Sequence, residues 1–234
     1  MPRAHLESRR AELENGASVG SSPHYVKESH LKSQRGTIAG VILAAGRSSR
    51  MGRPKSLLKH PGSGRTFVGH LIRTALDSGL DPVYVVARTG DGELAAETER
   101  QGGSLVVNPD PDRGQLSSIV AALPAVRASG ADAMVVLPVD VPLVSRAVVT
   151  AVLDAARDKG VHIARASHRG VHGHPVLFKR AVFDELLAAD PTIGARAVVR
   201  ADPARVRDVE VDDPGVTLDI DTPDDYVRVF GVKL

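Results

Sequence analysis

The sequence predicts an α/β fold in a single domain, with a mostly parallel sheet flanked by helices. Apolar segments of strand length alternate with segments whose apolar residues recur at helical spacing. The strand segments are apolar at nearly every position, which is typical of parallel strands buried on both faces. The length of 234 residues suits one such domain.

The clearest part of this pattern begins near Thr37. The run Thr37–Ala45 is rich in β-branched residues, is too short for a typical helix and ends at Gly46, which predicts a buried strand. Further strands are predicted over Pro82–Ala87, Ser104–Val107 and Ala133–Leu137. Helices are predicted over Thr66–Ser78, Ser117–Val126 and Ser145–Lys159.

The pattern is looser after Gly160. Strands near a sheet edge are predicted over Val161–Ala166, Pro175–Phe178 and Val206–Val211, and helices over Ala181–Ala188, Ile193–Val199 and Asp224–Phe230. We expect residues 37–234 to form the domain. Residues 1–36 have turn and linker composition and are expected to be a disordered extension, with a partner-binding arm as the alternative.

Composition excludes several classes of protein. The absence of cysteine removes disulfides, thiolate metal sites and cysteine nucleophiles. Residues 37–234 carry 24 basic and 24 acidic residues, and aromatic residues make up 3% of the chain, so we expect no nucleic-acid partner. No apolar run reaches the roughly 18 residues of a membrane span, and no signal peptide is evident, so we expect a cytoplasmic protein.

Three groups of residues lie where ligands of such sheets bind, after the predicted strands. Small residues at Leu43–Gly46 lead into Arg47, Arg50 and Lys55, which suit an anion such as a phosphate, although a solvated basic loop is also compatible. Asp140 follows a strand, and Asp219 and Asp221 flank Ile220. Carboxylates in this arrangement suit Mg²⁺, whereas the alternatives are a turn residue at Asp140 and helix capping at residues 219–225.

Two further segments carry candidate residues. Gly114, Ser117 and Ser118 precede an apolar helix and suit either ligand binding or capping of that helix. His172-Gly173-His174-Pro175 lacks a third metal ligand, and the proline holds His174 extended, which suits a substrate contact.

The order of these motifs resembles a known family. Leu43–Lys55 is similar to the signature L-A-A-G-x-S-x-R-M-G-x-x-K of nucleotidyltransferases, whose fold is Rossmann-like, of the nucleotide-diphospho-sugar transferase or glycosyltransferase-A type. Within this MobA-like NTP transferase superfamily, the later motifs resemble those of molybdenum cofactor cytidylyltransferases. They are Asn108-Pro, Gly114…Ser117-Ser118, Asp140-Val-Pro, Gly173-His-Pro and Asp219-Ile-Asp-Thr-Pro.

The resemblance implies that CMP is transferred from CTP, with Mg²⁺, to the phosphate of molybdenum-loaded molybdopterin, with release of pyrophosphate. A molybdoenzyme or its maturation chaperone is then an implied partner. Leu-Ala-Ala-Gly is similar to the cytidylyl branch and Leu-Ala-Gly-Gly to the guanylyl branch, and the methyl group of Ala45 would narrow the base pocket toward a pyrimidine.

The resemblance also implies a role for each candidate residue. Arg50 and Lys55 would hold the triphosphate, and Asp140 would bind Mg²⁺ with Asp221, or instead Asp219, as the second carboxylate. Gly173 and His174 would face the pterin. The nucleotide would contact Leu43, Ala44, Ala45, Gly46, Arg47, Ser48, Gly114, Ser117 and Ser118.

Other functions stay open. The same chemistry would serve a sugar or polyol phosphate acceptor, or GTP as the nucleotide. Some relatives of the family are nicotine-blue-type oxidoreductases, but the chain has no Gly-x-Gly-x-x-Gly motif for a nicotinamide cofactor. A non-catalytic cofactor-binding protein would not need Arg50, Lys55, Asp140 and Asp221 together.

Overall fold

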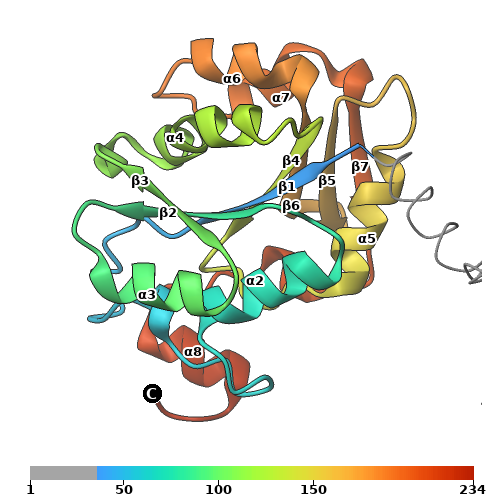
Figure 1. Ribbon diagram of the computed structural model, residues 1–234. Coiled ribbons are helices and arrows are strands. Elements are labelled where there is room, and N and C mark those ends of the chain that lie inside the picture. Colours follow the sequence, from blue (N-terminus) through green and yellow to red (C-terminus); the bar gives the residue numbers. More distant parts are fainter. Residues whose placement is uncertain (1–35) are drawn as a thin grey trace, which may run out of the picture. The chain divides into compact units, whose positions relative to one another are not determined.

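A seven-stranded sheet in the order β3-β2-β1-β4-β6-β5-β7 forms the centre of the molecule (Figure 1). The computed structural model describes residues 36–234, so the expectation for residues 1–35 lies outside the described residues. The strands are β1 Ile38–Leu43, β2 Val83–Arg88, β3 Ser104–Asn108, β4 Ala133–Pro138, β5 Ile163–His168, β6 Val171–Lys179 and β7 Val206–Glu210. Neighbouring strands are parallel except where β6 pairs with β4 and β5, which confirms the mostly parallel sheet.

Helices cover both faces of the sheet. Those longer than a single turn are α2 Phe67–Asp77, α3 Gly92–Arg100, α4 Gln115–Ala128, α5 Arg146–Ala155, α6 Phe183–Ala188, α7 Arg196–Ala201 and α8 Pro223–Phe230. Helices α4, α6 and α7 lie on one face, and α2, α3 and α5 on the other (Figure 1). Short 3₁₀ turns complete the fold: η1 Lys55–Leu57, η2 Pro111–Arg113, η3 Arg180–Val182, η4 Pro203–Arg205 and η5 Pro214–Thr217.

The strands are apolar along their length because helices cover both faces of the sheet. Successive side chains of a strand point to opposite faces. Val41 therefore joins the core under α4 and α6, whereas its neighbour Ile42 joins the core under α2 and α5. Both residues are fully buried, so neither face of β1 tolerates a polar side chain without cost.

The predicted elements differ from the structure mainly in the second half. The helix predicted over Ser145–Lys159 ends at Ala155, and the strand predicted over Pro175–Phe178 lies in the second half of the longer β6. His172–His174 therefore lie in a strand and do not follow one. Helix α3 is absent from the predicted elements because it packs on the edge of the sheet and needs few apolar residues; Leu94 is its one buried aliphatic side chain.

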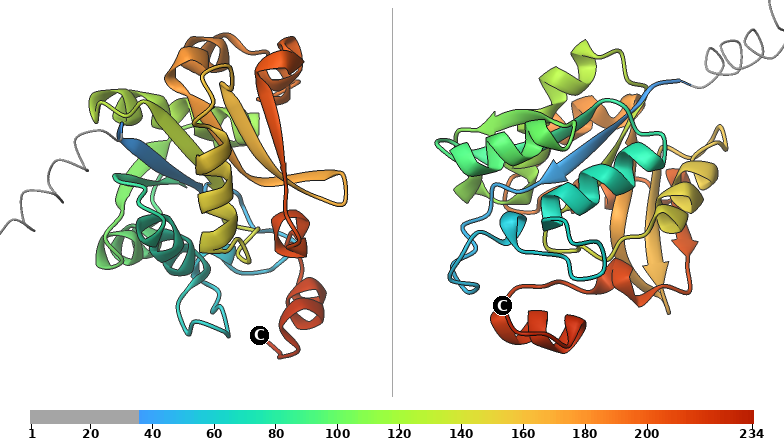
Figure 2. Two further views of the ribbon diagram at one scale, coloured as in Figure 1. Left: turned by 90° about the vertical axis from the view of Figure 1, so that its right-hand side faces the viewer. Right: turned by 60° about the horizontal axis from the view of Figure 1, so that its bottom comes forward.

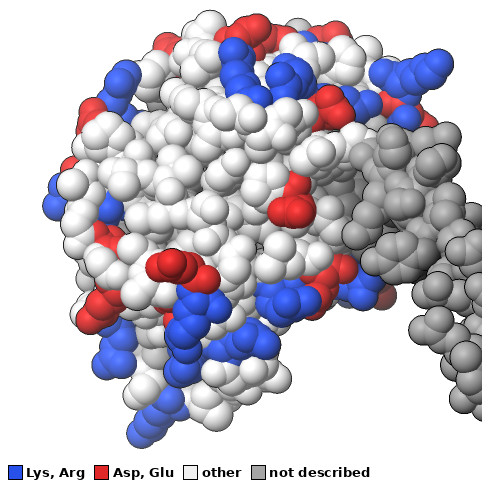
Figure 3. All heavy atoms as spheres, in the orientation of Figure 1, with Lys and Arg blue, Asp and Glu red and all other residues white. Residues whose placement is uncertain are grey.

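No helix in the described range is long and apolar enough to cross a membrane. The cytoplasmic location stays a prediction. On the face shown in Figure 3, basic and acidic side chains lie next to one another around the rim, and the centre of the face carries little charge.

An aromatic cluster fastens the C-terminal helix to α2. The Tyr226 hydroxyl donates to the carbonyl oxygen of Lys59 at 2.8 Å, and the rings of Phe67 and Phe230 pack against Tyr226. The ring of His60 contacts Phe230 and stacks on His70, with 4.0 Å between the two histidine centroids. These contacts hold α8, the red helix next to the C-terminus in Figure 2, against Lys59 and α2.

The stacked histidines predict a pH-dependent stability. Burial, followed by the charges of His60 and Arg65, lowers the pKa of His70 from 6.5 to about 4. The unfolded chain therefore binds a proton more readily, and the free energy of unfolding should fall as the pH drops from 6.5 to 4, then level off. We expect a loss of about 1–2 kcal/mol for this partly exposed group. Urea unfolding across that range measures it, and His70→Gln should flatten the slope; an unchanged slope in this variant would contradict the assignment.

Candidate nucleotide and metal site

The carboxyl ends of β1 and β4 form the place where the strand order of the sheet reverses. β1 pairs with β2 on one side and with β4 on the other, and Leu43 lies opposite Pro138. The amide of Val139 donates to the carbonyl oxygen of Leu43 at 3.0 Å, so the two chains leave the sheet together. Ligands of open α/β sheets bind in the crevice at such a point.

The loop after β1 has a fixed conformation. Ser48 adopts a positive φ of 52°, and its hydroxyl accepts a hydrogen bond from the Lys55 amide at 3.1 Å. Met51 is buried in the core and anchors the middle of the loop. Gly46 faces open space, where a Cβ atom would meet nothing within 4 Å. The loop thus offers exposed backbone at Gly46 and fixes the start of the Lys55 side chain.

Lys55 joins two carboxylates from distant parts of the chain. Its ammonium group makes an ion pair with Asp221 and lies 3.6 Å from the Asp140 carboxylate. The Lys55 side chain is 11% exposed, so this charge cluster is shielded from bulk water. Arg50 reaches the other oxygen of Asp221 at 2.6 Å from a largely exposed position. The structure therefore brings together four of the residues predicted from the sequence.

The acidic segment 219–221 is held by its central residue. Ile220 is fully buried, and its amide donates to the carbonyl oxygen of Asp140 at 2.8 Å. Helix α8 is capped by Thr222 and Asp225, whose side chains and backbone amides form a reciprocal capping box. The capping alternative therefore applies to Thr222 and Asp225, and it leaves Asp219 and Asp221 outside the helix.

The three carboxylates have different electrostatic surroundings. Burial raises the pKa of Asp221, but hydrogen bonds and charge from Lys55 and Arg50 outweigh it and lower the pKa overall. Partial burial and the negative charges of Asp140 and Asp221 raise the pKa of Asp219. Asp221 is thus stabilised as an anion, whereas Asp219 lies in excess negative charge that a cation would relieve.

These residues fit a metal ion only if a bound ligand supplies further oxygen atoms to it. In residues 36–234, no cluster of three or more His, Asp or Glu side chains is arranged to enclose a metal by itself. Asp140 and Asp221 nevertheless share one cation, Lys55, and both carboxylates are partly exposed. Mg²⁺ and Mn²⁺ accept a pair of carboxylates when phosphate oxygens and water complete the shell, which is the arrangement that this donor set fits.

The loop after β3 lies at the same edge of the sheet. The buried Asn108 side chain donates to the hydroxyls of Ser117 and Ser118 at 2.8 and 3.0 Å. Helix α4 begins at Gln115, its N-cap is Gly114 with a φ of 90°, and it has no side-chain cap. Ser117 and Ser118 therefore lie within its first turn, and the alternative that one of them caps the helix does not hold. Ser118 is buried, whereas Ser117 is partly exposed and Gly114 is exposed.

Asp112 connects this loop with the loop after β1. It forms a two-point ion pair with Arg47 and lies 3.6 Å from the guanidinium of Arg88. Asp112 and Arg88 are not among the residues predicted from the sequence. Arg88 ends a strand and Asp112 lies beside Gly114, but only the folded structure pairs them with Arg47.

The His172–Pro175 segment divides its side chains between two environments. His172 is exposed and contacts Arg165 and Asp208. The Nδ1 atom of His174 is buried, and no hydrogen-bond partner for it lies in the described part of the chain. Burial lowers the pKa of His174 to about 4, so its ring is neutral at pH 7. Gly173 packs against the backbone of η5.

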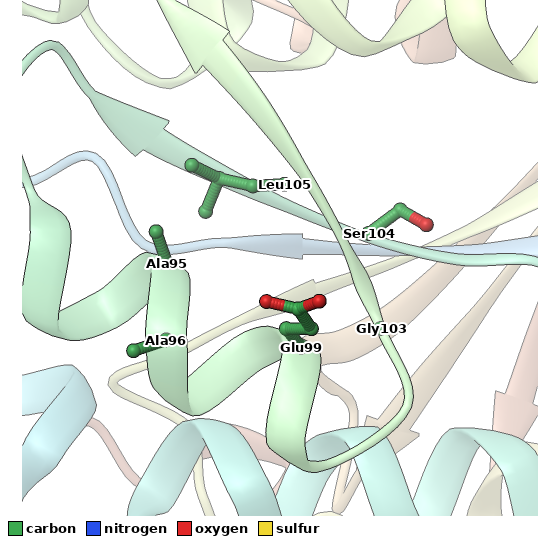
Figure 4. Close-up of a pocket in the computed structure, with 6 residues that line it drawn as sticks. All are labelled: Ala95, Ala96, Glu99, Gly103, Ser104 and Leu105. Carbon is green, nitrogen blue, oxygen red and sulfur yellow. The ribbon is translucent and has the colours of Figure 1, made fainter.

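Two hollows lie outside this charge cluster. One of about 520 Å³ lies between α3 and the beginning of β3, where the side chains of Ala95, Glu99 and Leu105 surround it (Figure 4). It is at the amino end of β3 and contains none of the predicted site residues. A second of about 350 Å³ contacts Asn108 and Ser117 but extends along the outer side of α4 toward Leu187.

Comparison with known proteins identifies the family of the chain. Residues 40–207 match the family described as MobA-like NTP transferase domain. The chain belongs to that family. It is therefore a nucleotidyltransferase-type enzyme, and the fold and the resemblance read from its motifs are confirmed.

Relatives in the family differ in their named activities. The chain is 32% identical to purine catabolism protein PucB of Bacillus subtilis, over 82% of this chain and 95% of the relative. It is 28% identical to the molybdenum cofactor cytidylyltransferase of Escherichia coli, over 80% and 92%. It is 29% identical to nicotine blue oxidoreductase of Paenarthrobacter nicotinovorans, over 82% and 96%.

Solved structures agree with the fold. Rv0371c of Mycobacterium tuberculosis H37Rv is 32% identical, with a TM-score of 0.71, and the match covers 85% of this chain and all of that one. A manganese complex of Rv0371c is 30% identical, with a TM-score of 0.67, over 83% and 98%. Nucleotidyltransferases of this fold depend on divalent metals, in keeping with the carboxylates beside Lys55.

The ion pair of Arg47 leads to a prediction for nucleotide affinity. If Arg47 binds the triphosphate, as the family resemblance implies, the nucleotide competes with Asp112 for it. An exposed ion pair contributes up to about 1 kcal/mol, so Asp112→Asn should tighten nucleotide binding by up to about fivefold. Titration calorimetry with the wild type and the variant measures the change. Asp184→Asn, which removes an exposed carboxylate paired with Arg127, is the matched control and should leave the affinity unchanged; weaker binding by Asp112→Asn would contradict the role of Arg47.

Proposed function

We propose that residues 37–234 transfer CMP from CTP to the phosphate group of molybdenum-loaded molybdopterin, with Mg²⁺. One observation carries the proposal: Lys55, at the end of the signature loop, holds Asp140 and Asp221 together at the carboxyl ends of β1 and β4. This combination of a fixed cation and paired carboxylates suits a reaction in which charge builds up on a triphosphate.

The residues divide into a nucleotide side and an acceptor side. The backbone around Leu43–Gly46 would contact the base and ribose, since the side chains of Leu43, Ala44 and Ala45 are buried. Ser48, Gly114, Ser117 and the edge of Ser118 would close around the nucleotide from two loops, with Arg47 as a phosphate ligand once it leaves Asp112. Gly173 and His174 would line the acceptor side, where a neutral, extended His174 suits an uncharged polar partner.

The transfer step requires little beyond positioning and charge. A phosphate oxygen of the acceptor forms a bond to the α-phosphorus of CTP, and the bond from that phosphorus to the bridging oxygen of the β-phosphate breaks. Pyrophosphate leaves with the electron pair. Asp140 and Asp221 would hold Mg²⁺, which when bound supplies charge neutralisation on the triphosphate. Lys55 and Arg50 would exchange part of their contact with Asp221 for phosphate oxygens and stabilise the leaving group.

CTP is the proposed nucleotide on two grounds. Leu43-Ala-Ala-Gly46 is similar to the cytidylyl branch of the family, and the cytidylyltransferase of E. coli is similar over 80% of this chain. Ala45 follows β1 and is 3% exposed. GTP and a phosphosugar acceptor are the alternatives within the same chemistry.

An oxidoreductase is the second candidate, because one relative is a nicotine blue oxidoreductase. Gly90-Asp-Gly92-Glu-Leu-Ala95 follows β2 and opens α3, which is the dinucleotide spacing with alanine in the final position. The Asp91 side chain, however, accepts a hydrogen bond from the Leu94 amide and so occupies this helix end with a carboxylate. A pyrophosphate would meet like charge there, which favours transfer over hydride chemistry.

Pyrophosphate release tests the proposal directly. The enzyme is supplied with Mg²⁺ and each of CTP, GTP, ATP and UTP, with and without molybdenum-loaded molybdopterin. We expect release only with CTP and the pterin together. Release with a sugar or polyol phosphate in place of the pterin would identify that phosphate as the acceptor and contradict the pterin assignment. No binding of any nucleotide, with oxidation of a reduced nicotinamide cofactor, would favour the second candidate.

Lys55→Ala should abolish most of the transfer. The ammonium group is shielded and would act on developing charge, so we expect kcat to fall by about 10²–10³-fold or more. Lys59→Ala changes an exposed lysine in the same segment and should leave kcat within twofold of the wild type. Steady-state kinetics measure kcat for both variants. A decrease in kcat of less than tenfold for Lys55→Ala would remove Lys55 from the mechanism.

A further inference from the structure

Gly173 of β6 lies in unusually close contact with another part of the backbone. A Cβ atom at this position would lie 2.1 Å from the carbonyl oxygen of Val216 and 2.7 Å from its carbonyl carbon. It would also lie 3.0 Å from a methyl carbon of Thr217. These distances are too short for any side chain, and the main obstacle is backbone that cannot rotate away. The chain can therefore close on β6 here only because residue 173 is glycine.

The segment that closes on Gly173 is η5, and it is fixed on its other side as well. The buried Gly215 faces Leu143, with only 2.8 Å from a Cβ atom at Gly215 to the Leu143 Cβ. Asp213 accepts hydrogen bonds from the Gly215 amide and from the Ser145 hydroxyl. The Val216 side chain is fully buried in the core. Turn η5 thus packs closely against β6 on one side and against the loop after β4 on the other.

Turn η5 leads directly into the acidic segment of the site. Four residues after Val216, Ile220 is again fully buried, and its amide bonds to the Asp140 carbonyl. Asp221 follows and meets Lys55. The position of Asp221 is therefore set by two buried anchors, Val216 and Ile220, joined by a short stretch of chain. Because packed interiors transmit displacement, a shift of η5 reaches Asp221.

We propose that Gly173 is a positioning residue: by lacking a side chain it lets η5 close on β6, and this places Asp221 beside Asp140 for a divalent cation. The inference rests on the proposed function and assigns Gly173 a role in the metal side of the site, through η5. A methyl group at residue 173 must displace Val216 by about 1 Å to reach ordinary contact distance. Misplacement of a functional group by that amount can lower a reaction rate by about 10²-fold.

Binding of Mn²⁺ tests the proposal without use of the acceptor. The full chain is titrated with Mn²⁺ in the presence of CTP, and free Mn²⁺ is followed by electron paramagnetic resonance. We expect Gly173→Ala to bind Mn²⁺ at least tenfold more weakly than the wild type. CTP affinity measured in EDTA should change less than twofold, because the loop after β1 is untouched. Raising the Mn²⁺ concentration should restore the amount of bound Mn²⁺ per chain to that of the wild type, which a loss of folded protein would not allow.

Two control variants give the expected upper and lower limits of Mn²⁺ binding. Gly160→Ala adds the same methyl group where nothing lies within 4 Å, and it should bind Mn²⁺ like the wild type. Asp140→Ala removes a proposed ligand and should abolish the binding. Circular dichroism at the titration temperature checks that each variant is folded. If Gly173→Ala does not fold, Gly215→Ala presses on η5 from the Leu143 side with a smaller overlap and should weaken Mn²⁺ binding in the same way.

The possible failures are separable. Folded Gly173→Ala with Mn²⁺ affinity within twofold of the wild type overturns the positioning role and leaves the proposed function intact. A wild type that binds no Mn²⁺ with any nucleotide overturns the proposed function, and the positioning role falls with it.

Discussion

The hydrogen bond from the Ile220 amide to the Asp140 carbonyl holds the site together. It joins the end of β4 to a segment far along the chain, and burial of Ile220 shields it from water. A backbone bond of this kind does not depend on the charge of the side chains beside it. Asp140 and Asp221 can therefore be held near each other despite their repulsion, with the backbone and the Lys55 ammonium opposing the separation.

Charge balance around Lys55 explains how the same residues suit an empty and a loaded site. Without a ligand, Asp221 is paired with Lys55 and Arg50, and Arg47 is paired with Asp112. Each cation that would meet a phosphate thus already has a carboxylate partner. A triphosphate with its divalent ion would give each of these side chains a new partner of opposite charge: phosphate oxygens for the cations and the metal ion for the carboxylates. Exchange of partners costs less than creation of an unpaired charge.

The elements up to β4, apart from α3, could be predicted well because local pattern and fold agree there. β1, β2 and β4 are continuously apolar and α2 has apolar residues at helical spacing, and the Leu43–Lys55 motif follows an inner strand, β1. The placement of Asp140 and Asp221 beside Lys55 was likewise accessible from motif order. The pairing of Asp112 with Arg47 and Arg88 was not, since contacts between loops depend on the path of the chain in space. Gly173 shows the same limit. Nothing in the residues around it in the sequence indicates a close contact, and only the approach of the η5 backbone in the fold explains why this position is glycine.

The route by which Asp221 reaches the site has a consequence for biosynthesis. The signature loop, Lys55 and Asp140 are all translated well before Asp221, and β6, which η5 packs against, also precedes it. A ribosome-bound chain that has already formed β1, β2 and β4 still lacks one of the two carboxylates beside Lys55. The crevice in such a nascent chain is more basic than in the finished protein. Under the proposed function, capture of a metal–nucleotide complex by these carboxylates would therefore wait until η5 has closed on the sheet.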